Sequence, residues 1–116
     1  MKRNDEHFDP GAKYHIPANV SYSRYFLAHL LQFQFHREMC RLAGYEGPLH
    51  ACSAYGSEEA GDALNTLLSA GKSQPWQDTL EAFNDQRDVD PQAMLDYFAP
   101  LKTWLDEQNR DRECGW

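Results

Sequence analysis

The sequence lacks both long apolar runs and an excess of basic residues. No stretch approaches the roughly 20 consecutive apolar residues that a membrane-spanning helix needs. No apolar segment follows Lys2 and Arg3, so we expect no secretory leader in this chain. With a formal net charge of −7, the chain also lacks the surplus of Lys and Arg that general nucleic-acid binding requires. We therefore expect no nucleic-acid partner and no transmembrane segment.

Familiar catalytic signatures are also missing. The sequence contains no HExxH, GxSxG, P-loop or GxGxxG motif, the local patterns of zinc peptidases, serine hydrolases and nucleotide sites. Alternation typical of a strand is confined to the five residues QFQFH, and their flanks favour a helix. The 116 residues suffice for one domain with a modest core.

What is present is helical spacing of apolar residues. Residues 1–19 are polar and interrupted by prolines, which predicts an irregular, partly extended lead-in. Residues 20–116 are predicted to be helical, so the fold class is all-α with about four helices. The expected helices span residues 20–43, 57–71, 73–85 and 90–109.

Residues that favour helix ends support these boundaries. Candidate N-caps are Asn19 or Ser21 for the first helix, Ser57 for the second and Asp90 for the fourth. Gly44 and Gly71 are expected just past the ends of the first and second helices. Pro100 falls within the fourth helix and is expected to bend it without ending it.

The first helix carries apolar residues on two adjacent faces. Such a broad apolar arc predicts burial on most sides, which a small domain cannot provide. We therefore expect an exposed apolar patch around Phe26, Leu30 and Phe33, and self-association through it.

The sequence has three cysteines, Cys40, Cys52 and Cys114, so at least one has no partner within the chain. Cys40 and Cys52 flank a loop rich in glycine. A disulfide there would contribute about 3 kcal/mol by the loop-entropy model, but two free thiols fit the spacing equally well.

His36 and Cys40, four residues apart, share a helix face and could be metal ligands. A closed site needs about four ligands, so a histidine beside a structural cysteine is the alternative interpretation.

The stretch KYHIPANVSYSRYF collects hydrogen-bond donors. Lys13 and His15 would share one side of an extended segment, and Tyr22 and Tyr25 one face of a helix. Beside a helix N-terminus, these groups suit a carboxylate or a carbonyl oxygen that gains negative charge. Arg24 points elsewhere around the turn and is a candidate for a separate anion. The alternative is that the lysine and arginine are solvated and the tyrosines pack.

Longer motifs resemble one known family. FDPGAKYHIP, YSRYF, LLQFQFH and CRLAGYEGPLHAC, followed by GKSQPW, AMLDYFAPLKTWL and the closing GW, are similar to the C-terminal part of the angiotensin-converting enzyme family. The similarity runs from about Phe8 to the end of the chain. It implies part of a larger α-helical zinc peptidase fold, in a family of peptidyl-dipeptidases that release dipeptides from the C-termini of peptides.

The resemblance implies roles by position. Lys13 and Tyr22 match family residues that hold the terminal carboxylate of the substrate. His15 and Tyr25 match catalytic residues that contact the carbonyl group near the zinc, and Arg24 matches a chloride ligand. Cys40 and Cys52 match a family disulfide. That pairing implies an oxidising compartment, extracellular or periplasmic, for the parent protein.

The chain departs from the family pattern in three places. Ser21 stands where proline is expected and creates the sequon Asn19-Val20-Ser21, which matters only in a secreted eukaryotic protein. His29 stands where an aromatic residue is common. The HExxH motif and the glutamate ligand of the family lie upstream of the similar region, so the resemblance places the zinc ligands outside this chain.

Two functional hypotheses follow. The first is a C-terminal part of a peptidyl-dipeptidase that grips the peptide C-terminus, supplies a chloride ligand, depends on the missing N-terminal part and is inactive alone. The second is a non-catalytic helical module that binds peptide C-termini or a partner chain. The sequence suggests no role for Cys114.

Overall fold

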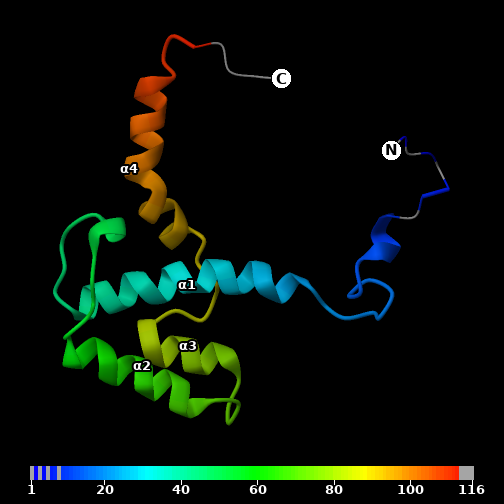
Figure 1. Ribbon diagram of the computed structural model, residues 1–116. Coiled ribbons are helices and arrows are strands. Elements are labelled where there is room, and N and C mark those ends of the chain that lie inside the picture. The colour runs from blue at the N-terminus through cyan, green and yellow to red at the C-terminus, as the bar shows by residue number, and fades with distance from the viewer. Residues whose placement is uncertain (1, 3, 5, 8, 113–116) are drawn as a thin grey trace.

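The computed structural model describes residues 2, 4, 6, 7 and 9–112, and these residues form helices without any strand (Figure 1). The prediction of an all-α fold with four helices is therefore confirmed. In chain order the elements are η1 (Asp9–Ala12), α1 (Ser23–Leu42), η2 (Leu49–Ala51), α2 (Glu58–Ala70), α3 (Trp76–Asn84) and α4 (Gln92–Gln108), where η denotes a 3-10 helix.

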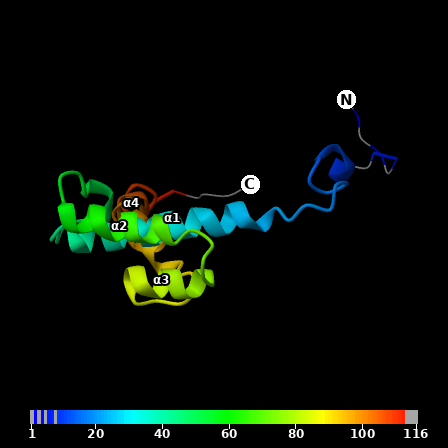
Figure 2. The same cartoon turned by 90° about the horizontal axis from the view of Figure 1, so that it is seen from below.

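The long helix α1 organises the molecule. Helices α2 and α3 contact α1 and one another, whereas α4 contacts only α1 and η2 among the described elements. In Figure 1, α2 and α3 lie on one side of α1 and α4 leaves from the other side, while Figure 2 shows α4 nearly end-on. The radius of gyration is 19.8 Å. A compact domain of this length has about 13 Å, so much apolar surface is left uncovered within the chain.

The lead-in, predicted to be irregular and partly extended, contains a 3-10 helix and a series of turns. After η1 the chain folds into consecutive turns, in which the Ile16 N–H donates to the Lys13 carbonyl (3.0 Å) and the Val20 N–H to the His15 carbonyl (2.9 Å). Asn19 completes these turns with a positive φ of 51°, a conformation that asparagine tolerates better than most residues. Local hydrogen bonds therefore fold the segment that contains Ile16 and Pro17 into turns.

Helix α1 begins three residues later than predicted, and the proposed side-chain caps were wrong. Tyr22 precedes the helix and makes no capping hydrogen bond through its side chain. Asn19 is held in the preceding turn, and the Ser21 hydroxyl lies 3.4 Å from the Ser23 hydroxyl. The Tyr22 side chain therefore accepts no hydrogen bond from the N–H groups in the first turn of α1.

The other helix-end predictions fared better. The Ser57 hydroxyl accepts a hydrogen bond from the Ala60 N–H at 3.2 Å, and Gly44 and Gly71 follow α1 and α2 with positive φ values. Pro91, rather than Asp90, directly precedes α4, yet the Asp90 carboxylate still accepts from the Gln92 N–H at 2.9 Å. Helix α4 continues through Pro100, as expected for a proline that interrupts only one backbone hydrogen bond.

The predicted exposed patch on α1 is only partly correct. Phe26 is 65% exposed, but Leu30 is buried at 8%. Phe33 is half-buried because its ring packs on Tyr97 and Phe98 of α4, with centroids 5.0 and 5.5 Å apart. The prediction failed at Phe33 because α4 packs against α1 there.

Two groups of exposed apolar side chains lie along helices, one at the start of α1 and the other along α4. The α1 group comprises Tyr22, Tyr25, Phe26 and Leu27, and the α4 group comprises Leu95, Phe98, Leu101, Trp104 and Leu105. None of the described helices is both long enough and apolar enough to cross a bilayer.

A buried polar side chain fastens α1 to the loop between α3 and α4. Gln34 is fully buried, and its amide nitrogen donates to the Gln86 side-chain oxygen (2.8 Å) and to the Asp88 carbonyl (3.2 Å). Its amide oxygen accepts from the Asp90 N–H at 3.0 Å. Beside it, Arg37 forms an ion pair with Asp90 at 2.5 Å. These contacts place the N-terminus of α4 against α1.

The Asp90 ion pair predicts a pH dependence of stability. The hydrogen bond from Arg37 holds the pKa of Asp90 below its ordinary value of 3.8, although burial opposes this shift. A carboxyl whose pKa is lower in the folded state stabilises the fold above the unfolded pKa and loses that contribution as the pH falls through the folded value. The free energy of unfolding should therefore fall as the pH drops below about 4.

Urea unfolding at a series of pH values measures this effect. In Asp90→Asn the amide oxygen can still accept from the Gln92 N–H, but the titrating charge is gone, so the acid-induced loss of stability should be smaller. Asp106→Asn is the matched control, because Asp106 pairs with Lys102 on the exposed side of α4. Equal acid sensitivity in the wild type and Asp90→Asn would show that this ion pair is not responsible.

Candidate functional site

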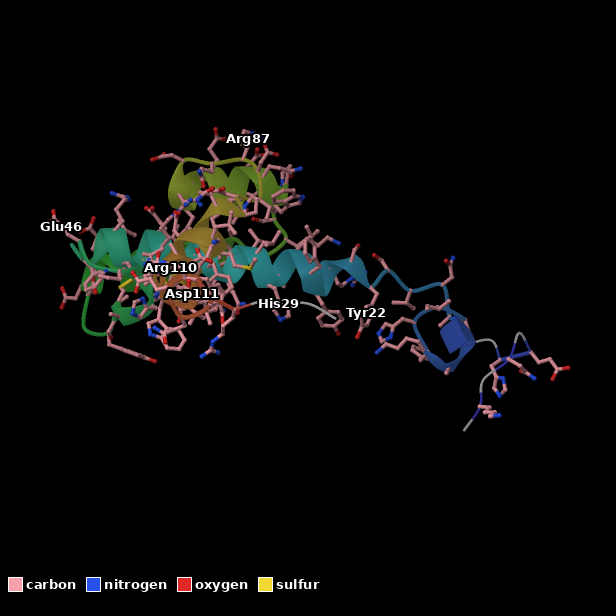
Figure 3. All side chains as sticks on the ribbon, turned by 90° about the horizontal axis from the view of Figure 1, so that it is seen from above. Tyr22, His29, Glu46, Arg87, Arg110 and Asp111 are labelled. Carbon is pink, nitrogen blue, oxygen red and sulfur yellow. A yellow bond between two sulfur atoms is a disulfide. The ribbon has the colours of Figure 1, made fainter. Side chains whose placement is uncertain are left out.

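The turns of the lead-in bring Lys13 and His15 to the start of α1. The Lys13 ammonium lies 4.7 Å from the centre of the Tyr22 ring, and the His15 ring packs edge-on against the same ring with centroids 4.4 Å apart. Figure 3 shows Tyr22 where α1 meets the loop of the lead-in, at the opposite end of the helix from Glu46. The lysine and the first tyrosine of the predicted site therefore meet on one side of the molecule.

Tyr25 continues this cluster along the helix. Its ring lies 5.1 Å from that of Tyr22, as expected for residues three apart in a helical turn. On the other side, the Tyr14 ring packs edge-on against His15 at 5.6 Å. Tyr14 was not among the predicted site residues. The spacing of residues in the sequence does not indicate that a turn will place the Tyr14 ring against His15.

The cluster lines a shallow cavity of about 510 Å³. Its walls are Lys13, His15, Ile16, Asn19, Val20, Ser21 and Tyr22. Within the described part of the chain, the buried Nδ1 atom of His15 has no hydrogen-bond partner. A buried ring nitrogen without a partner is energetically costly, so a ligand or a water that bonds to it would be favoured.

Arg24 and His29 extend from the same helix. Arg24 is exposed in the first turn of α1, two residues after Tyr22 and therefore on another side of the turn. His29 follows Tyr25 by four residues, and its Nδ1–H donates to the Tyr25 carbonyl at 2.6 Å. This bond leaves the Nε2 lone pair of a neutral His29 free on the face that Tyr22 and Tyr25 occupy.

Cys40 and Cys52 form a disulfide with their Cα atoms 6.2 Å apart. It ties α1 to the residue after η2. The ring of His36 is adjacent, with Nε2 2.9 Å from the Leu49 carbonyl oxygen and 3.6 Å from the Cys40 sulfur. Because the two sulfurs are bonded to each other, Cys40 is not available to bind a metal together with His36 in this structure.

Comparison with known proteins gives the family. The model of the angiotensin-converting enzyme family, peptidase M2, matches residues 1–116. Angiotensin-converting enzyme of Mesocricetus auratus is 50% identical over 116 residues, which cover 98% of this chain and 9% of that protein. The enzyme of Sus scrofa is 50% identical over 108 residues, covering 93% of this chain and 8% of that protein.

A more distant relative agrees. The angiotensin-converting enzyme-related protein of Drosophila melanogaster is 47% identical over 113 residues, covering 92% of this chain and 18% of that protein. The chain therefore belongs to the angiotensin-converting enzyme family. It spans less than a fifth of the length of these relatives.

The residues described here do not fit the zinc of this family. A peptidase zinc needs three protein ligands and a water. Among the described residues, one group of His, Cys, Asp or Glu side chains is close enough to hold a metal, namely His36, Cys40 and Cys52. Two of these three are joined in the disulfide. We therefore derive no catalytic step through a metal held by this chain.

Proposed function

We propose that this chain supplies one wall of the substrate cleft of a zinc peptidyl-dipeptidase, which releases dipeptides from the C-termini of peptides. The supporting observation is the packing of the Lys13 ammonium and the His15 ring on Tyr22 at the mouth of α1. A positive charge and a phenol on one side of a cavity suit the terminal carboxylate of a peptide. Family membership supplies the class of substrate.

The remaining hydrogen-bond donors are proposed to contact the peptide beyond its terminal carboxylate. His15 and Tyr25 lie on either side of Tyr22 and are proposed to contact the carbonyl group next to the carboxylate grip. A hydrogen-bond donor there acts most strongly when the carbonyl oxygen gains negative charge. Arg24, exposed in the first turn of α1, offers a guanidinium to a chloride ion.

The zinc and the base that activates its water are proposed to come from a segment that carries HExxH, a motif absent from these 116 residues. The partner of this chain is then the N-terminal part of the peptidase. The Cys40–Cys52 disulfide supports an oxidising compartment, extracellular or periplasmic, for the parent protein.

A cleavage assay tests whether this chain hydrolyses peptides without the rest of the peptidase. The pure 116-residue chain, given a blocked tripeptide and zinc, is expected to show no turnover above the blank, because it lacks a base positioned beside a metal. Chelator-sensitive release of a dipeptide by this chain would overturn that expectation. We expect the chain to bind a peptide carboxylate without cleaving the peptide. The Lys13 variant described in the Discussion tests the binding.

A second candidate is a non-catalytic helical module that binds peptide C-termini or a partner chain. It is favoured by the exposed apolar stripe on α4, where Leu101 is 50% and Trp104 is 55% exposed. The coding sequence next to the gene distinguishes the two proposed functions. An upstream exon or an adjacent reading frame that encodes HExxH supports the peptidase, whereas a complete promoter and stop without such a neighbour supports the module.

The exposed apolar groups on α1 and α4 also predict self-association of the isolated chain. Phe26 and Trp104 are more than half exposed, and exposed apolar surface of this kind drives association in water. Light scattering should show species larger than a monomer, and the dye ANS should bind. Phe26→Ser combined with Trp104→Ser should reduce both signals. A monodisperse monomer that does not bind ANS would contradict this prediction.

A further inference from the structure

The disulfide and its neighbours form a cluster that the proposed function does not use. The ligand atoms of His36, Cys40 and Cys52 all lie within 4.8 Å of one another. His36 and Cys40 occupy successive turns of α1, and Cys52 directly follows η2. Two sulfurs and one imidazole are the ligand types that zinc prefers in proteins. The question is what these residues do when the disulfide is open.

Hydrogen bonding prepares His36 to act as a ligand. A carbonyl oxygen only accepts hydrogen bonds, so the contact of 2.9 Å with Leu49 means that His36 Nε2 carries the proton. The neutral ring then has its lone pair on Nδ1, which lies 3.9 Å from the Cys40 sulfur, while the protonated Nε2 lies 3.6 Å from it. Histidines that bind metals commonly donate their other ring N–H to a backbone carbonyl in this way.

The separations are close to those of a metal site. In a tetrahedral zinc site, bonds of about 2.3 Å to sulfur and 2.0 Å to nitrogen place the ligand atoms about 3.5–3.8 Å apart. The distance from His36 Nδ1 to the Cys40 sulfur is already near this range. The Cys52 sulfur would have to move away from Cys40 by less than about 2 Å once the bond between them is broken.

Solvent and reagents reach the disulfide from one side. Cys52 is only half-buried and lines an open cavity of about 510 Å³ between α1, α4 and η2. The cavity walls are Gln32, Phe33, His36, His50, Cys52, Tyr97 and Phe98. A small reductant and a hydrated cation can therefore approach without unfolding of the chain.

We propose that reduction of the disulfide turns His36, Cys40 and Cys52 into a site for one thiophilic divalent cation such as zinc, with a water as fourth ligand. A dithiol supplies two electrons and two protons, which leaves two protein thiols and the oxidised, cyclic disulfide of the reductant. Binding of the cation as two thiolates then releases two protons. The metal replaces the disulfide as the link between α1 and the segment after η2. This inference does not depend on the proposed peptidase role.

The test compares the oxidised and reduced 116-residue chain. The reduced chain is freed of dithiol under anaerobic conditions and titrated with zinc in competition with a chromophoric chelator. We expect one zinc per reduced chain and none bound to this cluster in the oxidised chain. Cobalt should give the absorption bands of a tetrahedral site with thiolate ligands. Circular dichroism, recorded before and after zinc is added, follows the helical content.

Three variants assign the ligands. His36→Gln can still donate to the Leu49 carbonyl but lacks the Nδ1 ligand, so its zinc affinity should fall at least about tenfold. His50→Gln and Cys114→Ser remove other potential ligands and should leave the affinity unchanged. The proposal is overturned if reduction adds no zinc site, or if either control variant weakens binding as much as His36→Gln. A reduced chain that loses its helices and does not regain them with zinc also overturns it.

Discussion

Replacing Gln34 by leucine is expected to lower the free energy of unfolding by roughly 2–3 kcal/mol, although leucine is similar in size and more apolar. Gln34 is fully buried and makes hydrogen bonds to Gln86, Asp88 and Asp90. Leucine leaves the Asp90 N–H without its acceptor, at a cost of about 1–3 kcal/mol when no water replaces it. The carbonyl of Asp88 and the side chain of Gln86 lose a donor as well.

Thermal and urea unfolding measure the loss, which corresponds to a decrease in Tm of about 10 °C for a domain of this size. Gln32→Leu is the matched control, because the same substitution two residues earlier falls on an exposed position of α1. It should change stability by less than about 0.5 kcal/mol. Equal unfolding midpoints for the two variants would show that the buried amide contributes nothing.

Gln34 also marks the limit of what the sequence could predict about the fold. The spacing of apolar residues predicted four helices, and local signals such as Ser57 and Gly71 gave several of their ends. Gln34, inside QFQFH, resembles any polar residue on a helix. Its partners lie 52 to 56 residues further along the chain, and no local pattern indicates which distant groups a buried amide will meet.

The error at Leu30 has the same origin. Helical spacing grouped Leu30 with Phe26 and Phe33, but which of these residues is exposed depends on how the other helices pack on α1. For α4, this packing includes the ion pair of Arg37 with Asp90 and the contact of Phe33 with Tyr97, which join distant segments. Periodicity therefore predicted the apolar face of α1, and only the fold shows which part of this face is covered.

The sequence predicted that Lys13 and His15 lie near Tyr22, although it assumed another conformation. Lys13 and His15 were expected on one side of an extended segment, yet they share a side because turns curl the lead-in back onto Tyr22. The family resemblance grouped the same residues without needing the conformation. The roles assigned to them remain proposals, and the effect of Lys13 on binding is the decisive measurement.

Lys13→Ala is expected to abolish the preference of the chain for a free peptide carboxylate. An acetylated dipeptide should bind the wild-type chain about tenfold more tightly than the same dipeptide with a C-terminal amide, as expected for one charge-assisted hydrogen bond. We take the lower end of the usual range because Lys13 is exposed and water competes for its ammonium. In the alanine variant the two peptides should bind equally.

NMR titrations at low ionic strength measure both affinities, and added salt should weaken the carboxylate preference because the charges are solvent-exposed. Tyr22→Phe keeps an aromatic ring beneath the ammonium but removes the phenol, so the preference should fall by only about threefold. Lys72→Ala removes an exposed lysine beyond α2 and is the control for net charge. If Lys72→Ala reduces the preference as much as Lys13→Ala, the attraction is a general effect of charge and no grip exists at the start of α1.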